Sequence, residues 1–177
     1  EDDAKIAIQA AKTAQAAWTD LTPVQRGHIL HDITLDMRNN REEIATIVAA
    51  ETGMSFKAAL GETVGAIAQG EFMAGEGRRF YGRTTTSAVP NKYAMTVRQP
   101  LGVAGLIIAA NTPIANIAWK VFPAMICGNS AVLKADEDTP DTAWYFARMA
   151  HEIGLPPGVL NIIQGYGEEA GVPICTN

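Results

Sequence analysis

Lys134 and Glu137 are residues whose types and spacing suggest chemistry. Lys134 ends a short apolar run, and Glu137 follows it three residues later. A carboxylate accepts hydrogen bonds from vicinal hydroxyl groups and an ammonium group donates to them, so the pair suits a ribose in a cleft. Alternatively, the acidic residues belong to a solvated loop, with Thr139 as the cap of a helix that starts at Pro140. The residues alone favour this second interpretation.

The segment Gly165-Tyr166-Gly167-Glu168-Glu169-Ala170 matches the glycine pattern G-x-G-x-x-[GA] of dinucleotide-binding turns. An ordinary glycine-rich turn before a helix explains the segment equally well. The dinucleotide pattern normally follows the first strand of its sheet and precedes an acidic residue about 20 positions further on. Here it follows a later apolar run, so the match alone decides nothing.

Asn111 stands where another apolar run ends, just before Thr112-Pro113. Most loop asparagines form turns. An asparagine amide can also donate a hydrogen bond to an oxyanion that develops during a reaction, a role worth roughly 10²–10³ in rate. Both interpretations remain open from the residues alone.

The cysteines and histidines predict no metal or disulfide chemistry. Cys127 and Cys175 are too few and too irregularly placed for a disulfide framework or a zinc site. Cys127 ends an apolar helix with no histidine nearby, so we predict a buried structural thiol. His28 and His31 lie three residues apart without cysteine or acidic partners, and we predict surface histidines.

Helical patterns precede these candidates and occupy about the first 80 residues. Small residues and Trp18 recur at helical spacing in the first helix. Thr22, Pro23 and Gln25 then provide the N-cap, the first residue and the capping-box partner of a second helix.

The next two helices of this region are delimited by polar and glycine residues. A third helix is predicted to end at Gly53, and Ser55 is predicted to cap a fourth that runs to about Phe80. Gly61 and Gly65 lower the helix propensity within the fourth helix.

After Pro100, short apolar runs alternate with helical stretches. The runs cover residues 103–109, 131–134 and 159–163, with helices at 114–126 and 139–153. This alternation predicts a parallel sheet, with functional loops at the carboxyl ends of its strands. Before it, residues 84–86 and 93–97 flank a turn at Pro90-Asn91 and predict a two-stranded hairpin.

The composition excludes several classes of protein. The 177 residues are 47% hydrophobic and 19% charged, as in a globular protein with one core. The net charge of −5 and the lack of any Lys/Arg run argue against nucleic acid or an anionic membrane surface as partner. No apolar stretch approaches the roughly 20 residues that cross a bilayer, and Glu1-Asp2-Asp3 is acidic where a signal peptide would be basic. We expect a soluble, cytoplasmic protein.

Several segments, in order along the chain, resemble the aldehyde dehydrogenase superfamily. The resemblance runs through nearly the whole chain, and chance does not explain so many ordered matches. The segments are Glu51-Thr52-Gly53, Gln99-Pro100-Leu101-Gly102-Val103, Trp119-Lys120, Pro123-Ala124, the stretch from Gly128 to Lys134 and the stretch from Leu155 to Asn161.

The resemblance implies an α/β fold, in which a helical amino-terminal region precedes a partial Rossmann-like parallel sheet in the order βαβαβ. Residues 83–99 would form a projecting oligomerisation hairpin, so we expect a homodimer or homotetramer. Residues 1–177 would be a partial NAD(P)-binding domain without the catalytic domain.

The resemblance also implies residue roles. Asn111 would stabilise the oxyanion, Lys134 and Glu137 would hold the adenosine ribose, Gly167 and Gly171 would flank the adenine, and Ile107 and Ile108 would line the cofactor cleft. The family usually has Pro-Trp-Asn-Phe-Pro around the asparagine, whereas this chain has Ala109-Ala110-Asn111-Thr112-Pro113. The substrate pocket or the nicotinamide end of the cleft is therefore expected to differ.

The reaction implied is the oxidation of a small aldehyde to a carboxylic acid, with NAD as the expected cofactor and NADP as the alternative. A cysteine thiolate attacks the aldehyde to form a thiohemiacetal, hydride passes to the nicotinamide, and a glutamate-activated water releases the acid. Both residues belong to the later half of the family's sequence, so we expect this chain alone to be an inactive fragment. The alternative is a nucleotide-binding or oligomer-forming module without catalysis.

Overall fold

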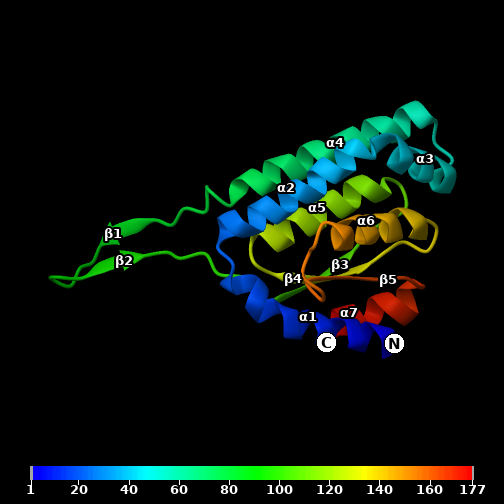
Figure 1. Cartoon of the computed structure of the whole chain (residues 1–177). Helices are drawn as coiled ribbons and strands as arrows, with labels where there is room; N and C mark the ends of the chain where they lie inside the picture. The colour runs from blue at the N-terminus through cyan, green and yellow to red at the C-terminus, as the bar shows by residue number, and fades with distance from the viewer. Residues whose placement is uncertain (1, 177) are drawn as a thin grey trace.

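The computed structural model describes residues 2–176, and Glu1 and Asn177 lie outside this range. Four helices come first, then a hairpin, then alternating strands and helices (Figure 1). The first helices are α1 (Asp2–Asp20), α2 (Pro23–Asn39), α3 (Arg41–Thr52) and α4 (Phe56–Glu76). The hairpin consists of β1 (Thr84–Thr86) and β2 (Tyr93–Met95). The remaining elements are β3 (Val103–Ile107), α5 (Pro113–Ile126), β4 (Ser130–Lys134), α6 (Pro140–Glu152), β5 (Leu160–Ile163), the π-helical turn η1 (Gly167–Gly171) and α7 (Val172–Thr176).

The main sheet contains three parallel strands in the order β3-β4-β5, which confirms the prediction from the alternating pattern. In the register of this sheet, Ile107 lies beside Lys134, and Lys134 lies beside Ile163. The carboxyl ends of all three strands are therefore level with one another. Every residue of β4 is buried, as expected for the central strand of a parallel sheet.

Helices cover both faces of this sheet. Figure 1 shows α1 and α7 on one face and α2, α4, α5 and α6 on the other. Trp18 of α1 is buried, and its indole Nε1 donates a 3.0 Å hydrogen bond to the carbonyl oxygen of Met125 in α5. Phe122 and Phe146 meet edge to face with ring centroids 6.0 Å apart, which joins α5 to α6 in the core.

Local capping interactions determine where the amino-terminal helices begin and end. Thr22 and Gln25 form the predicted capping box at the start of α2. The Ser55 side chain accepts a hydrogen bond from the Ala58 N–H and caps α4. Gly53 ends α3 with a left-handed φ of 72°, which favours glycine.

Helix α4 is continuous from Phe56 to Glu76 in spite of the low helix propensity of Gly61 and Gly65. The packing of its opposite face overrides the low propensity of the two glycines. There the backbone of Gly70 approaches α2 and α5 so closely that an added Cβ would lie 2.7 Å from Thr34 Oγ1 and 2.9 Å from the Phe122 ring.

The hairpin extends away from the body of the molecule (Figure 1). Thr84 pairs with Met95 and Thr86 with Tyr93 in antiparallel register, and all residues of both strands are exposed. This confirms the prediction of a projecting two-stranded hairpin.

Candidate functional site

The candidate site lies along the carboxyl edge of the sheet. Lys134 ends β4 with a side chain only 4% exposed, and its Nζ lies 2.5 Å from Oε2 of Glu137, whose side chain is 39% exposed. The hydrogen bond from the Lys134 ammonium group is the main cause of a lowered pKa of Glu137. The site therefore presents a stable carboxylate above a buried cation, a pair that can accept from and donate to vicinal hydroxyl groups.

Asn111 lies in the loop between β3 and α5, with an exposed side chain. Its Oδ1 accepts a 3.4 Å hydrogen bond from Nδ2 of Asn116, which also donates to the carbonyl oxygen of Ala109 and to Oγ1 of Thr112. The Asn111 Nδ2 itself donates no hydrogen bond to any group within residues 2–176. The amide is thus held through its oxygen, and its N–H donors are not used by the described residues.

The glycine-rich segment forms the loop after β5. Gly165 adopts a φ of 135°, and a Cβ added there would lie 3.3 Å from the Ala170 Cβ, so the loop folds tightly onto η1. Gly167 is exposed, with no atom within 4 Å of an added Cβ. Gly171 is buried, and a Cβ added there would lie 3.8 Å from Cδ1 of Ile107. The structure therefore brings Gly171 and Ile107 together and leaves Gly167 apart from them.

Ile107 and Ile108 face different surroundings. The Ile107 side chain is 40% exposed at the end of β3, whereas Ile108 is 4% exposed and belongs to the hydrophobic core. Lys120 of α5 donates a hydrogen bond from Nζ to the carbonyl oxygen of Ile107. This places an exposed cation beside the strand end. Lys120 belongs to the segment Trp119-Lys120 that resembles the family, but the resemblance implied no role for it.

Glu62 of α4 reaches the amino terminus of α5, directly after the Asn111 loop. Its Oε1 accepts a 3.1 Å hydrogen bond from the Ala115 N–H, and its Oε2 is buried without a partner in the described part of the chain. Burial raises the pKa of Glu62, although hydrogen bonds from Ala115 and Ile114 oppose this shift. No spacing in the sequence points to this residue, because Glu62 and Ala115 are 53 positions apart.

The start of α6 corrects one prediction. Thr139 occupies the N-cap position but its side chain makes no capping hydrogen bond. The carboxylate of Glu51, at the end of α3, caps this helix instead. Sequence reasoning noted Glu51 only as part of a family segment.

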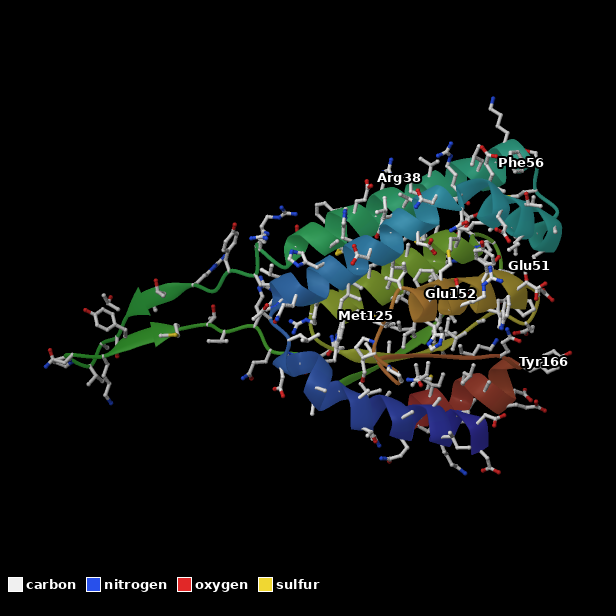
Figure 2. The ribbon with its side chains drawn as sticks, in the orientation of Figure 1. Arg38, Glu51, Phe56, Met125, Glu152 and Tyr166 are labelled. Atoms are coloured by element: carbon white, nitrogen blue, oxygen red, sulfur yellow. The ribbon has the colours of Figure 1, made fainter. Side chains whose placement is uncertain are left out.

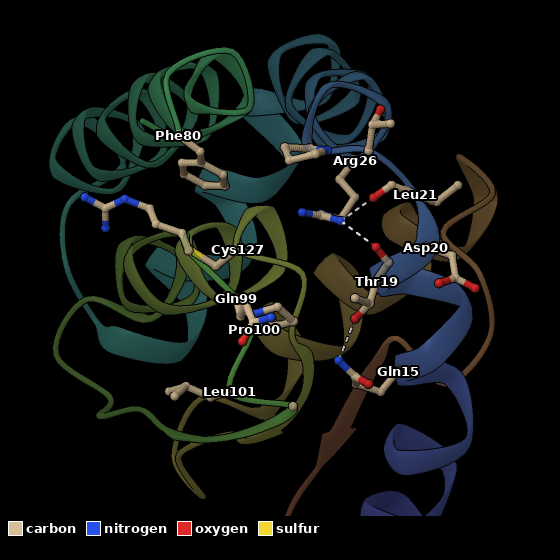
Figure 3. A pocket seen from close by; sticks show the side chains of 14 residues that line it. Gln15, Thr19, Asp20, Leu21, Arg26, Phe80, Gln99, Pro100, Leu101 and Cys127 are labelled. Atoms are coloured by element: carbon tan, nitrogen blue, oxygen red, sulfur yellow. Dashed lines mark hydrogen bonds between the residues drawn. The ribbon is translucent and has the colours of Figure 1, made fainter. Parts of the chain in front are cut away.

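A separate cavity of about 860 Å³ lies at the amino ends of β3 and β4 (Figure 3). Arg26 is buried in its wall and donates hydrogen bonds to the carbonyl oxygens of Thr19, Leu21 and Ile126. Because ligands of parallel sheets bind at the carboxyl ends of the strands, this cavity is not the candidate cofactor site.

Cys127 lines the same cavity and is exposed, so the prediction of a buried thiol was wrong. It follows the last residue of α5, where the chain turns toward β4, and its side chain faces the cavity (Figure 3). Desolvation in the cavity wall raises the pKa of the Cys127 thiol, while Arg26 and Arg98 oppose this shift. The raised pKa disfavours the thiolate, which a nucleophile requires.

His28 and His31 are exposed on α2, as predicted. No group of three or more metal-ligating side chains occurs within residues 2–176. None of the helices described for this range is long and apolar enough to cross a membrane.

Fold and loop positions define an α/β protein with polar groups at the carboxyl edge of a parallel sheet. The aldehyde dehydrogenase family model matches residues 1–177. Retinaldehyde dehydrogenase 3 of Rattus norvegicus is 37% identical over 177 residues, covering 99% of this chain and 34% of that protein. Lactaldehyde dehydrogenase from Escherichia coli superposes with a TM-score of 0.96 and 35% identity, over 98% of this chain and 36% of that chain. An NADP-dependent enzyme of E. coli superposes with a TM-score of 0.97 and 34% identity, over 99% and 37%.

The chain therefore belongs to the aldehyde dehydrogenase family, which confirms the resemblance seen in the sequence. It spans about a third of the length of the relatives that it matches. Family members are oxidoreductases that act on aldehydes and use NAD or NADP.

Proposed function

We propose that this chain is the cofactor-binding part of an enzyme that oxidises an aldehyde to a carboxylic acid with NAD. Family membership supports the reaction class. The observation that carries the proposal is the pairing of Lys134 with Glu137 at the carboxyl edge of the sheet, level with the ends of the two neighbouring strands. The Asn111 loop leaves one of those strands and the glycine loop leaves the other.

The donor and acceptor groups of this edge suit a dinucleotide. The Glu137 carboxylate would accept from ribose hydroxyl groups, and the Lys134 ammonium group would donate to them. Exposed Ile107 would provide an apolar wall, with Gly167 and Gly171 beside the adenine and Ile108 supporting the strand end from the core. When bound, the cofactor would accept the hydride that leaves the substrate.

NAD is the proposed cofactor because a carboxylate that accepts from the ribose hydroxyls would repel a 2′-phosphate. A glutamate carboxylate is ionised at neutral pH, and the lowered pKa of Glu137 extends its charged form to more acidic pH. An enzyme of similar structure is NADP-dependent, and the nearby Lys134 would partly offset the repulsion. The proposed difference between the two cofactors is therefore a preference.

Asn111 is the residue of this chain proposed to act in the chemistry. Its N–H donors, which bind no other group among the described residues, would stabilise the negative oxygen of a thiohemiacetal without any proton transfer. The nucleophilic cysteine and the glutamate that activates water would lie in the remainder of a complete enzyme. The chain by itself would then bind the cofactor without turnover.

The hairpin supports an additional role in assembly. Tyr93 is 82% exposed and Met95 68% exposed, on a ribbon whose outer strand edges are unpaired among the described residues. Such edges and apolar side chains suit pairing with another copy, so we propose a homo-oligomer. A stand-alone nucleotide-binding or oligomer-forming module without catalysis is the alternative function.

Two measurements test the proposed function. NAD titration of the protein, followed by intrinsic tryptophan fluorescence, should show saturable binding that Glu137→Ser weakens. A panel of small aldehydes should then yield NADH with the intact enzyme and none with residues 1–177 alone. Absence of NAD and NADP binding to both forms would refute the cofactor role, and binding without turnover by the intact protein would favour the alternative.

A further inference from the structure

The amino terminus of α6 needs a hydrogen-bond acceptor from elsewhere in the chain. Its first residue is Pro140, which has no N–H, and the following N–H groups belong to Asp141 and Thr142. Thr139 does not accept from them, and its own Oγ1 is buried without a partner in the described residues. The first turn of α6, which follows the loop that carries Glu137, is therefore not capped by its own N-cap residue.

Glu51 supplies this cap from α3. Its Oε1 accepts a 2.6 Å hydrogen bond from the Asp141 N–H, and its Oε2 accepts a 2.9 Å bond from the Thr142 N–H. The hydroxyl group of Thr142 also donates to Oε2. The partners are 90 and 91 positions away from Glu51 in the sequence. A carboxylate at a helix amino terminus interacts favourably with both the free N–H groups and the helix dipole.

Glu51 lies at the end of the molecule that carries the candidate cofactor site. Figure 2 shows Glu51 at the same end of the molecule as Tyr166, in the loop after β5, and opposite the hairpin. Between Lys134 and Pro140 the chain runs through residues 135–139 only. One end of this loop is held by the sheet register of Lys134, and the other end by the bonds from Glu51.

We propose that Glu51 is a positioning residue that holds the loop so that Glu137 lies where it can accept from the cofactor ribose. This inference deepens the proposed function and rests on it. Glu51 itself does not contact the cofactor in this proposal. Its effect passes through the start of α6 and the short loop, because a five-residue segment fixed at both ends has few conformations.

A purely structural cap has different consequences from a positioning residue. Losing a structural cap lowers stability but leaves the discrimination between NAD and NADP unchanged. Displacing Glu137 removes a hydrogen-bond acceptor for NAD and a repulsive charge for NADP. The ratio of the two dissociation constants therefore reports the loop position and is insensitive to a uniform loss of stability.

The test uses Glu51→Ala in the intact enzyme, with Ser55→Ala as the matched control. Ser55 caps α4 through the Ala58 N–H and has no bond to the loop, so this control also loses one helix cap. Dissociation constants for NAD and NADP are measured by fluorescence titration, together with Tm. For Glu51→Ala we expect the Kd for NAD to rise on the order of tenfold, with a smaller change for NADP. Ser55→Ala should lower Tm and leave the ratio unchanged.

Two milder variants keep the test decisive if Glu51→Ala does not fold. Glu51→Gln retains one acceptor oxygen, and Thr142→Val removes only the hydroxyl donor. Both variants should lower the ratio of the Kd for NADP to the Kd for NAD less than Glu51→Ala does. Hydrogen exchange should show faster exchange of the Asp141 and Thr142 amides in the variants that lose capping bonds.

The outcomes distinguish failure of the positioning role of Glu51 from failure of the proposed function. If wild type binds NAD, Glu137→Ser changes the ratio and the Glu51 variants do not, the positioning role is refuted and the proposed function stands. If wild type binds neither cofactor, both fail. A narrowed ratio in Glu51→Ala that does not change further in Glu51→Ala/Glu137→Ser supports the positioning role, since coupled residues are not additive.

Discussion

The Nζ of Lys134 lies 2.5 Å from Oε2 of Glu137, across the first turn of the loop that leaves β4. The lysine side chain is nearly buried and the carboxylate is partly exposed, so the pair points its negative end toward solvent. A cofactor that approached this edge would meet the carboxylate first.

Replacement of Glu137 is expected to change cofactor discrimination. Glu137→Ser removes the acceptor for the ribose hydroxyls and the charge that opposes a 2′-phosphate, so the NAD preference should narrow. The measurement is the ratio of kcat/KM values for NAD and NADP in the intact enzyme. Asp138→Ser, which removes an exposed carboxylate from the same loop, is the control and should leave the ratio unchanged. An unchanged ratio in Glu137→Ser would remove Glu137 from the cofactor site.

The pH dependence of NAD binding follows from the lowered pKa of Glu137. A carboxylate with a depressed pKa contributes above its ordinary value of 4.5 and loses its contribution only as the pH falls through the lower, perturbed value. Between about pH 7 and about pH 5, Glu137 should therefore cause no loss of NAD affinity. Titrations across this range check the expectation. In Lys134→Met, which lacks the main cause of the shift, affinity should begin to fall at a higher pH than in wild type.

Asn111→Ala is expected to separate chemistry from binding. The lost amide would act mainly on the transition state, so kcat should fall on the order of 10²–10³ while NAD affinity stays nearly intact. Single-turnover measurements of hydride transfer, together with NAD titration, check this result. Asn116→Ala should cost less, because it keeps the Asn111 amide and removes the hydrogen bonds from Asn116 to Asn111, Ala109 and Thr112 that hold the loop. Near-normal hydride transfer in Asn111→Ala would show that Asn111 is only a turn residue.

Two glycines of α4 should respond oppositely to alanine. Gly70→Ala places a Cβ within 3 Å of Thr34 and Phe122 and should destabilise the fold by about 1–3 kcal/mol. Gly61→Ala meets no atom within 4 Å and should be neutral or stabilising by up to about 1 kcal/mol. The free energy of unfolding from denaturant titration distinguishes them. Equal effects of the two substitutions on the free energy of unfolding would contradict the close packing of Gly70 against Thr34 and Phe122.

The hairpin should determine assembly and have little influence on the fold. Tyr93→Lys with Met95→Lys places two charges on exposed positions of β2, which would have to be buried in an interface. Sedimentation of the intact enzyme should then show a smaller species with unchanged secondary structure. Arg38→Ala on the distant surface of α2 is a control that should keep the wild-type mass. A wild-type protein that is monomeric at all concentrations would refute the interface.

The order of elements and most local caps could be predicted from the sequence. Thr22 with Gln25, Ser55, and Gly53 each act on groups within a few positions, so their residue types and spacing are sufficient. The alternation of apolar runs and helices likewise restricts the sheet to parallel strands, because a crossover helix returns the chain in the same direction. The candidate residues at strand ends follow from that alternation.

Tertiary structure alone decided which distant groups meet. The cap of α6 comes from Glu51 instead of Thr139, Gly171 packs against Ile107, and Cys127 faces a cavity instead of the core. Spacing along one helix does not specify which other helix approaches its end. That choice depends on how α3, α5 and α6 pack together over the sheet, and only the packed structure determines which N–H groups and which surfaces are left for a distant side chain to satisfy.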